Sequence, residues 1–199
     1  MISIAIHGGA GVISRASMSA ENERAYRADL ERALDAGYGI LEKGGSSIDA
    51  TIAAVRILED SPYFNAGHGA VFNHAGINEL DAAIMDGATQ KAGAVAGVKH
   101  IRNPIELARM VMERTPHVLL SGEGAEEFAL EQGVTLVPGS YFYTERRWKQ
   151  LEDAQKSERV ASLDEDIGYF GTVGAVARDK SGNLAAATST GGMTNKRWG

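Results

Sequence analysis

The chain has 199 residues, 44% of them hydrophobic, which suits one globular domain with a buried core. Its net charge of -6, with no basic run, argues against nucleic acid or an anionic membrane as a partner. The absence of cysteine excludes a disulfide framework, a thiolate metal site and a catalytic thiol. The first residues resemble no signal peptide, and no apolar stretch is long enough to span a bilayer, so we expect a cytoplasmic protein.

The first elements are a strand, a glycine-rich loop and a helix. The apolar run over residues 2–6 predicts a buried strand that leads into the loop His7–Gly11. That loop matches neither the dinucleotide fingerprint nor the P-loop. Ser19 is a suitable N-cap for a helix that continues to about Lys43. Its predicted core-facing residues recur at helical spacing: Leu30, Leu34, Tyr38 and Leu41.

A second helix and three strands are predicted next. Ser46 or Ser47 caps the helix, which ends before Pro62. The tight glycine loop Phe64–Ala70 follows, and its carbonyl groups either ring a monovalent cation or form a plain turn. The segments predicted to be consecutive antiparallel strands are 71–73, 79–87 and 91–98.

Two acidic residues in these strands are candidate catalytic carboxylates. They are Asp81 and Asp86. The alternative is a structural role, with Asp81 as a hydrogen-bonded polar group inside the sheet and Asp86 as a turn former. We favour the structural role.

The second half continues with short elements. Asn103 and Pro104 open a helix to Arg114, and a short strand and another helix to about Gly133 come next. The aromatic and basic segment Tyr141–Trp148 favours packing over a stacking platform for nucleic acid. A helix over about 144–154 precedes a polar linker, placed at about 155–171.

The last part of the chain predicts a β-hairpin. Its strands are residues 172–178 and 184–190, and it turns at residues 179–182. Thr172 follows Gly171 directly and begins the first strand just after the polar linker. A threonine in that position is what a self-cleaving N-terminal nucleophile requires. A plain β-hairpin explains the same pattern without a catalytic role. The pattern alone leaves both interpretations open.

Taken together, these segments resemble the isoaspartyl peptidase/L-asparaginase family, or plant-type asparaginases, of the N-terminal-nucleophile hydrolases. The resemblance covers almost the whole chain in order. The segments that carry it are His7–Gly11, Phe64–Gly69, Glu79–Ala82, Met85–Gly87, Ala92–Ala96, Pro116–Val118, Gly122–Glu126, Gly171–Ala177 and Ala186–Lys196.

The resemblance implies an α+β protein with a four-layer αββα sandwich. A single domain over 1–199 would be cut between Gly171 and Thr172, into an α-subunit (1–171) and the start of a β-subunit (172–199). The mature enzyme would be a dimer of αβ units. It would hydrolyse β-aspartyl dipeptides and the side-chain amide of L-asparagine, with no organic cofactor.

The resemblance also assigns roles to single residues. Thr172 would be the nucleophile, Thr190 would hydrogen-bond to it, Asn65 would lie near the scissile bond, and Gly9 and Gly11 would belong to a loop at the same site. A structural sodium ion would be bound by the backbone carbonyl groups of Leu58, Glu59, Ser61, Phe64, Ala66 and His68. In some members a loop that corresponds to Thr115–Val118 binds an activating potassium ion.

The family pattern continues beyond Gly199, with an arginine and an aspartate for the substrate and a Thr-Gly pair for the oxyanion hole. Arg197 lies too early to be that arginine. We therefore expect the active protein to include a further part of the β-subunit. The alternative is an uncleaved or truncated inactive precursor with a structural or binding role. Glycosylasparaginase, a relative with this fold, is disfavoured because no targeting signal is recognisable.

Overall fold

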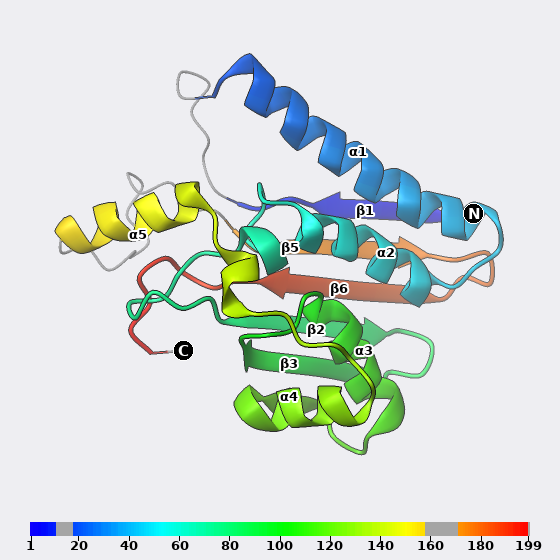
Figure 1. Cartoon of the computed structure of the whole chain (residues 1–199). Helices are drawn as coiled ribbons and strands as arrows, with labels where there is room; N and C mark the ends of the chain where they lie inside the picture. Colours follow the sequence, from blue (N-terminus) through cyan, green and yellow to red (C-terminus); the bar gives the residue numbers. More distant parts are fainter. Residues whose placement is uncertain (11–17, 158–170, 199) are drawn as a thin grey trace.

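The computed structural model describes residues 1–10, 18–157 and 171–198, and the strands within them form one sheet (Figure 1). These strands are β1 (Ser3–His7), β2 (Leu80–Asp86), β3 (Ala92–Val98), β4 (Leu119–Ser121), β5 (Val173–Arg178) and β6 (Leu184–Thr190). Their order is β1-β5-β6-β2-β3-β4, and all neighbours are antiparallel except β3 and β4, which are parallel. The N-terminal strand therefore lies beside the predicted hairpin, which is confirmed as β5 and β6.

Five helices accompany the sheet in the described part of the chain. They are α1 (Ala20–Glu42), α2 (Ser47–Asp60), α3 (Pro104–Arg114), α4 (Gly122–Glu131) and α5 (Glu145–Lys156). In Figure 1, α2 and α3 lie in front of the sheet and α1 runs above β1, whereas α5 projects past the end of the sheet. Short 3-10 helices occur at Gly67–Gly69 and Gly139–Phe142. None of the described helices is both long and apolar enough to cross a membrane.

Only one face of the sheet is covered by these helices. Along β5, Val173, Ala175 and Ala177 are buried, whereas the intervening Val176 is 53% exposed. This alternation places the core between the sheet and the helix layer. On the other face, a hollow of about 420 Å³ is lined by residues of β1, β2, β5 and β6. The described residues thus supply one helix layer and one sheet, and the α+β class is confirmed.

Most helix starts agree with the sequence-based predictions. The Ser19 hydroxyl accepts a hydrogen bond from the Asn22 amide, and the Ser46 hydroxyl accepts one from the Asp49 amide, each 3.1 Å long. Asn103 precedes α3 as predicted, but its side chain makes no capping bond. It donates instead to a carboxylate oxygen of Asp60, at 3.2 Å.

The predicted buried face of α1 is partly wrong. Leu34 and Tyr38 are exposed, at 39% and 44%. The residues that α1 buries are Asp29, Ala33, Gly37 and Leu41. A small residue is required there, because a Cβ atom on Gly37 would lie 2.9 Å from the carbonyl oxygen of Ala50 in α2. Close approach of two helices, rather than large side chains, therefore decides which face is buried.

Two other predicted segments need correction. Residues 71–73 are not a strand, because Asn73 folds the chain into a turn: its side-chain oxygen accepts hydrogen bonds from the amides of Ala75 and Ile77. The predicted linker begins too early, since α5 continues through Gln155 to Lys156. Most of the remaining linker, residues 158–170, lies outside the described residues.

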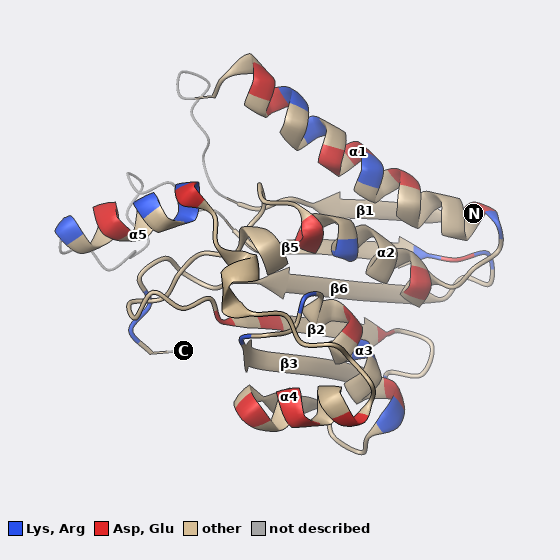
Figure 2. Ribbon diagram, viewed as in Figure 1, with Lys and Arg blue, Asp and Glu red and all other residues tan. Residues whose placement is uncertain are grey.

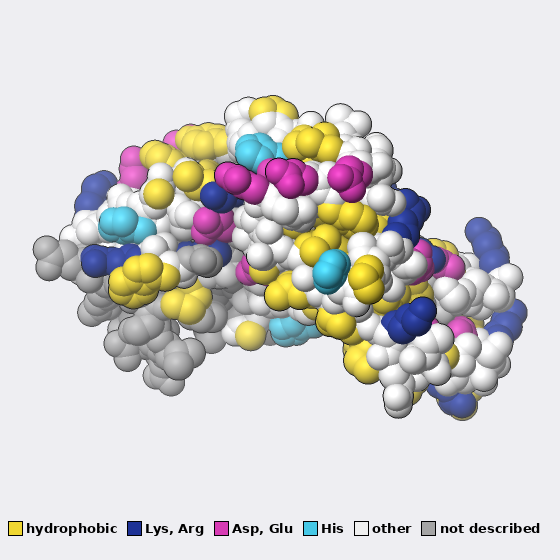
Figure 3. Space-filling model, turned by 90° about the horizontal axis from the view of Figure 1, so that it is seen from below, with side chains coloured by type: hydrophobic (Ala, Val, Ile, Leu, Met, Phe, Trp, Pro, Cys, Tyr) yellow, Lys and Arg dark blue, Asp and Glu magenta, His cyan; other side chains and the backbone are white. Residues whose placement is uncertain are grey.

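The described surface carries charge of both signs, unevenly distributed. Figure 2 shows mixed charges along α1 and α5, but mainly acidic residues along α4. Seen from below, a row of acidic side chains lies beside apolar ones (Figure 3). The exposed apolar residues on β4 and α4 include Leu119 and Leu130.

Candidate active site

Thr172 lies at one end of the sheet, immediately before β5. In the antiparallel pair of β5 and β6, Val173 is opposite Ser189. Continuing this register by one residue places Thr172 opposite Thr190, with both side chains on the sheet face that no described helix covers. Thr172 and Thr190 are half-buried. The sheet register therefore brings the predicted nucleophile to its predicted partner.

The glycine loop after β1 lies against the bond predicted to be cut. Gly9 has a φ of +125°, and a Cβ atom there would lie 2.9 Å from the carbonyl oxygen of Gly171. A Cβ atom on Gly171 would lie 2.5 Å from the amide nitrogen of Ala10. Any side chain at either position would push the two backbones apart. Gly11, the second glycine predicted for this loop, lies outside the described residues.

Asn65 joins the loop after α2 to the turn after β6. Its side-chain nitrogen donates to the carbonyl oxygen of Gly192 at 2.7 Å, and its side-chain oxygen accepts from the Val71 amide at 3.0 Å. The amide of Gly192 also donates to the hydroxyl of Thr190, at 3.0 Å. Gly192 is therefore the residue through which Asn65 and Thr190 are connected.

Backbone carbonyl groups pack closely against the glycine turn at the predicted cation site. A Cβ atom on Gly67 would lie 2.3 Å from the Glu59 oxygen, and one on Gly69 would lie 2.2 Å from the Phe64 oxygen and 2.8 Å from the Ser61 oxygen. Three of the six predicted ligands thus surround one short glycine turn, and uncharged oxygen donors fit a hard monovalent cation. Leu58 lies in α2, Ala66 precedes the turn, and His68 lies within it.

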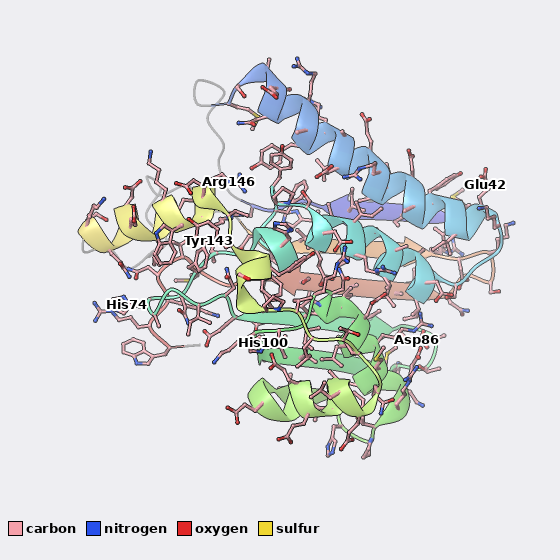
Figure 4. All side chains as sticks on the ribbon, in the orientation of Figure 1. Glu42, His74, Asp86, His100, Tyr143 and Arg146 are labelled. Atoms are coloured by element: carbon pink, nitrogen blue, oxygen red, sulfur yellow. The ribbon has the colours of Figure 1, made fainter. Side chains whose placement is uncertain are left out.

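Two arginines that the sequence did not reveal hold this loop in place. Arg147 of α5 is fully buried, and its Nε donates to the carbonyl oxygen of Gly69 at 2.6 Å. Desolvation of the guanidinium lowers the pKa of Arg147 to about 9. Arg146, labelled in Figure 4, donates to the carbonyl oxygens of Pro62 and Tyr63, both at 2.9 Å. The start of α5 is therefore fixed to the loop by cationic groups.

Glu59 is a third residue whose side-chain role could not be predicted. It is fully buried beneath β6, where one carboxyl oxygen accepts from the Ser189 hydroxyl at 2.7 Å and from the Ile105 amide at 3.0 Å. Burial raises the pKa of Glu59 to about 8, because these hydrogen bonds only partly offset the cost of desolvating the charge. The carboxyl group connects α2, α3 and the strand that carries Thr190.

Because the pKa of Glu59 is raised, we predict that the free energy of unfolding depends on pH. Between about pH 4.5 and 8 the folded state keeps a proton that the unfolded state releases, so the free energy of unfolding falls as pH rises, by about 1.4 kcal/mol per pH unit. Glu59→Gln keeps the accepting oxygen but cannot ionise. We expect denaturant titrations at fixed sodium concentration to show the variant gaining stability relative to wild type across this window.

Asp86→Asn is the matched control for that experiment. The Thr89 hydroxyl bonds to the Asp86 carboxylate and lowers its pKa, so this group is ionised in both folded and unfolded states over most of the window. The control should differ from wild type by a constant amount across that pH range. A constant difference for Glu59→Gln as well would contradict the raised pKa of Glu59.

The other candidate carboxylate, Asp81, lies on β2 directly opposite Thr190. One of its oxygens accepts a hydrogen bond from the Gly97 amide at 2.8 Å. Asp86 is the last residue of β2, and its carboxylate accepts from the Ala88 amide and the Thr89 hydroxyl in the turn that follows. These contacts are consistent with the structural role that we favour for both Asp81 and Asp86.

A cavity of about 930 Å³ opens beside Gly192. Its lining includes the carboxylates of Asp81 and Glu79. Glu79 lies between the cationic side chains of Lys99 and Lys196, which also line the cavity. Within the described residues, no cluster of three or more His, Asp or Glu side chains could bind a metal ion. The end of the sheet therefore combines a threonine pair, a glycine loop and a charged cavity.

Comparison with known proteins gives this arrangement a family. A family model described as Asparaginase matches residues 1–199. The isoaspartyl peptidase of Salmonella typhimurium is 56% identical over 199 residues, with 97% of this chain and 63% of the relative covered. The isoaspartyl peptidase of Escherichia coli is 54% identical over 199 residues, with coverages of 97% and 62%.

A human relative, named isoaspartyl peptidase/L-asparaginase, is 50% identical over 197 residues, with 98% of this chain and 62% of the relative covered. The chain therefore spans about three-fifths of the length of these curated relatives. The family match covers every residue, and these identities extend over almost the whole chain. The chain belongs to the asparaginase family that includes the isoaspartyl peptidases.

Proposed function

We propose that the protein cuts itself before Thr172 and then acts as an N-terminal-threonine hydrolase on β-aspartyl dipeptides and L-asparagine. One observation carries the proposal: the loop at Gly9 closes on the carbonyl of Gly171, next to the facing pair Thr172 and Thr190. The names of the relatives, isoaspartyl peptidase and isoaspartyl peptidase/L-asparaginase, support the choice of substrates.

Self-cleavage needs only groups at this end of the sheet. The Thr172 hydroxyl oxygen adds to the Gly171 carbonyl carbon, and the C–N bond then breaks as the nitrogen takes up the hydroxyl proton. The product is an ester, which water hydrolyses to a carboxylate on Gly171 and a free α-amine on Thr172. Gly171 has no side chain to block the approach, and the Gly9 backbone fixes the position of its carbonyl.

Substrate hydrolysis would use the same threonine in a second role. The Thr172 hydroxyl attacks the β-carbonyl of the substrate while its own α-amine accepts the proton, since an α-amine with a pKa near 8 is a suitable base close to neutral pH. The C–N bond of the substrate then breaks, and ammonia or the amino acid leaves with that proton. Water hydrolyses the β-aspartyl ester that remains, which releases aspartate and restores the hydroxyl. The β-branch limits the rotamers of the hydroxyl. Thr190 would hydrogen-bond to the nucleophile, and Asn65 would hold the Gly192 turn beside the scissile bond.

The proposed assembly is a dimer of αβ units, with a structural sodium ion at the carbonyl loop and potassium as the alternative cation. A cytoplasmic location remains a prediction from the sequence. The competing proposal is an uncleaved or truncated inactive precursor with only a structural or binding role. The assay that separates them measures ammonia from L-asparagine and leucine from β-aspartyl-leucine. The precursor proposal predicts neither product.

Sodium binding makes a prediction about thermal stability. A ligand present at about 100 times its Kd stabilises a folded protein by about 2.7 kcal/mol, which is about 5–10 °C in Tm for a chain of this size. We expect a fall of this order when tetramethylammonium replaces sodium. Gly69→Ala should abolish the difference, because its Cβ atom would displace the Phe64 carbonyl.

The matched control is Gly124→Ala, where a Cβ atom meets nothing within 4 Å. This variant should keep the full dependence of Tm on sodium. An identical Tm for the wild-type protein in both salts would show that the carbonyl loop binds no sodium.

A further inference from the structure

The cavity beside Gly192 is much larger than one of the two proposed substrates requires. Its volume is about 930 Å³, within the range of sites that enclose whole small molecules. The leaving group of asparagine is ammonia, which would fill little of it. The leaving group of a β-aspartyl dipeptide is an amino acid with a side chain and a free carboxylate. Apolar lining residues such as Met193 and Ala96 suit the side chain of that amino acid, and cationic lining residues suit its carboxylate.

Two lysines at this cavity share one carboxylate. Lys99 Nζ lies 3.8 Å from one oxygen of Glu79, and Lys196 Nζ lies 3.6 Å from the other. Both separations exceed the 2.7–2.9 Å typical of a close hydrogen bond between ammonium and carboxylate. Arg197 adds a third positive charge to the lining, against the two negative charges of Glu79 and Asp81. The lining thus carries an excess of one positive charge.

Lys196 is fixed in place at the edge of the catalytic region. Its side chain is only 14% exposed, and its Nζ lies 3.1 Å from the position of a Cβ atom on Gly192. The carbonyl oxygen of Lys196 accepts from the His74 amide at 2.8 Å, and the neighbouring Asn195 bonds to the His74 ring at 2.8 Å. His74 and Tyr143 lie at this end of the molecule (Figure 4). The Gly192 amide donates in turn to the Thr190 hydroxyl. Gly192 therefore lies between the ammonium group of Lys196 and the threonine pair.

We propose that Lys196 and Lys99 bind the free carboxylate of the amino acid that leaves a β-aspartyl dipeptide. This inference rests on the proposed function, since it assigns the leaving-group side of the same site. Glu79 holds the two ammonium groups together in the free protein, at distances long enough for a ligand carboxylate to make closer contacts. The subsite favours dipeptides over asparagine, because asparagine has no carboxylate on its leaving group.

The test compares three substrates on the whole protein: β-aspartyl-leucine, its C-terminal amide, and L-asparagine. Lys196→Met should raise the KM for β-aspartyl-leucine by about 10- to 100-fold, the value of a hydrogen bond between charged groups. It should leave kcat/KM for the amide and for asparagine within about twofold of wild type. Lys196→Arg should restore most of the loss. Glu79→Gln, which frees both ammonium groups, should lower the KM for β-aspartyl-leucine.

Lys91→Met is the matched control, because Lys91 is exposed at the far end of the same pair of strands. It should leave the KM and the kcat/KM for all three substrates unchanged. Equal losses on all three substrates in Lys196→Met would overturn the inference, because they would indicate a structural role or a contact to the shared aspartyl part. No loss on β-aspartyl-leucine would overturn it as well.

Failure of the proposed function is a separate outcome. If the wild-type protein cleaves none of the three substrates, the hydrolase proposal fails. Calorimetry on Thr172→Ala then still tests the subsite, by comparing the binding of β-aspartyl-leucine with that of its amide. The subsite is supported if Thr172→Ala binds the dipeptide more tightly than the amide, and if adding Lys196→Met removes this difference in affinity. Equal binding of dipeptide and amide overturns it.

Discussion

Thr172→Ala is expected to abolish both self-cleavage and hydrolysis while the protein stays folded. The variant has no hydroxyl to attack the Gly171 carbonyl, and no other threonine stands at the start of β5. Loss of the catalytic nucleophile of the serine protease subtilisin costs about 10⁶-fold in kcat, and we expect a loss of that order here. Precursor accumulation on a denaturing gel measures the cleavage step, and product release from both substrates measures turnover. Thr172→Ser should keep both reactions, at lower rates because the β-branch is gone.

The matched control for that variant is Thr188→Ala. Thr188 lies on the same sheet face, and its hydroxyl donates to the carbonyl oxygen of Val173 at 3.1 Å. Removing this single hydrogen bond costs about 1 kcal/mol of stability and leaves the nucleophile intact. Thr188→Ala should therefore cleave and turn over substrate. Self-cleavage of Thr172→Ala at the same bond would show that another group is the nucleophile.

Gly9→Ala is expected to slow self-cleavage by about 100-fold. The φ of +125° at Gly9 is strained for alanine, and the new Cβ atom would lie 2.9 Å from the Gly171 oxygen, where it displaces the carbonyl under attack. A misplacement of about 1 Å in a reacting group is enough for a rate loss of that size. The half-time for conversion of the precursor, followed on a denaturing gel, measures the effect.

Gly39→Ala is the control for the glycine substitution. Gly39 is within α1, where a Cβ atom meets nothing within 4 Å, and alanine favours the helix there. The control precursor should be processed at the wild-type rate. Wild-type processing of a folded Gly9→Ala precursor would show that the loop does not position the scissile carbonyl.

Local signals in the sequence were sufficient for most of the secondary structure. Ser19 and Ser46 cap their helices as predicted, and the run after Gly171 forms the first strand of a hairpin. The errors arise where distant contacts override the local pattern. The helical spacing of Leu34 and Tyr38 predicts a buried face, but close packing through Gly37 turns both side chains toward solvent.

Family motifs, rather than the periodicity of the sequence, predict the residues of the candidate site. The register of β5 with β6 places Thr172 opposite Thr190, and Asn65 reaches Gly192 across 127 positions of sequence. What the sequence could not show is the burial of charged groups. Glu59 and Arg147 lie on helices where acidic and basic residues are usually exposed, and only the tertiary fold encloses them.

We propose that the protein itself cuts the bond between Gly171 and Thr172. The most direct test is the intact mass of the purified, denatured protein after incubation at neutral pH. We expect two species, one of which ends at Gly171 while the other begins at Thr172, and a single uncut species for Thr172→Ala. A single uncut mass for the wild-type protein, or a cut at any other bond, would contradict it.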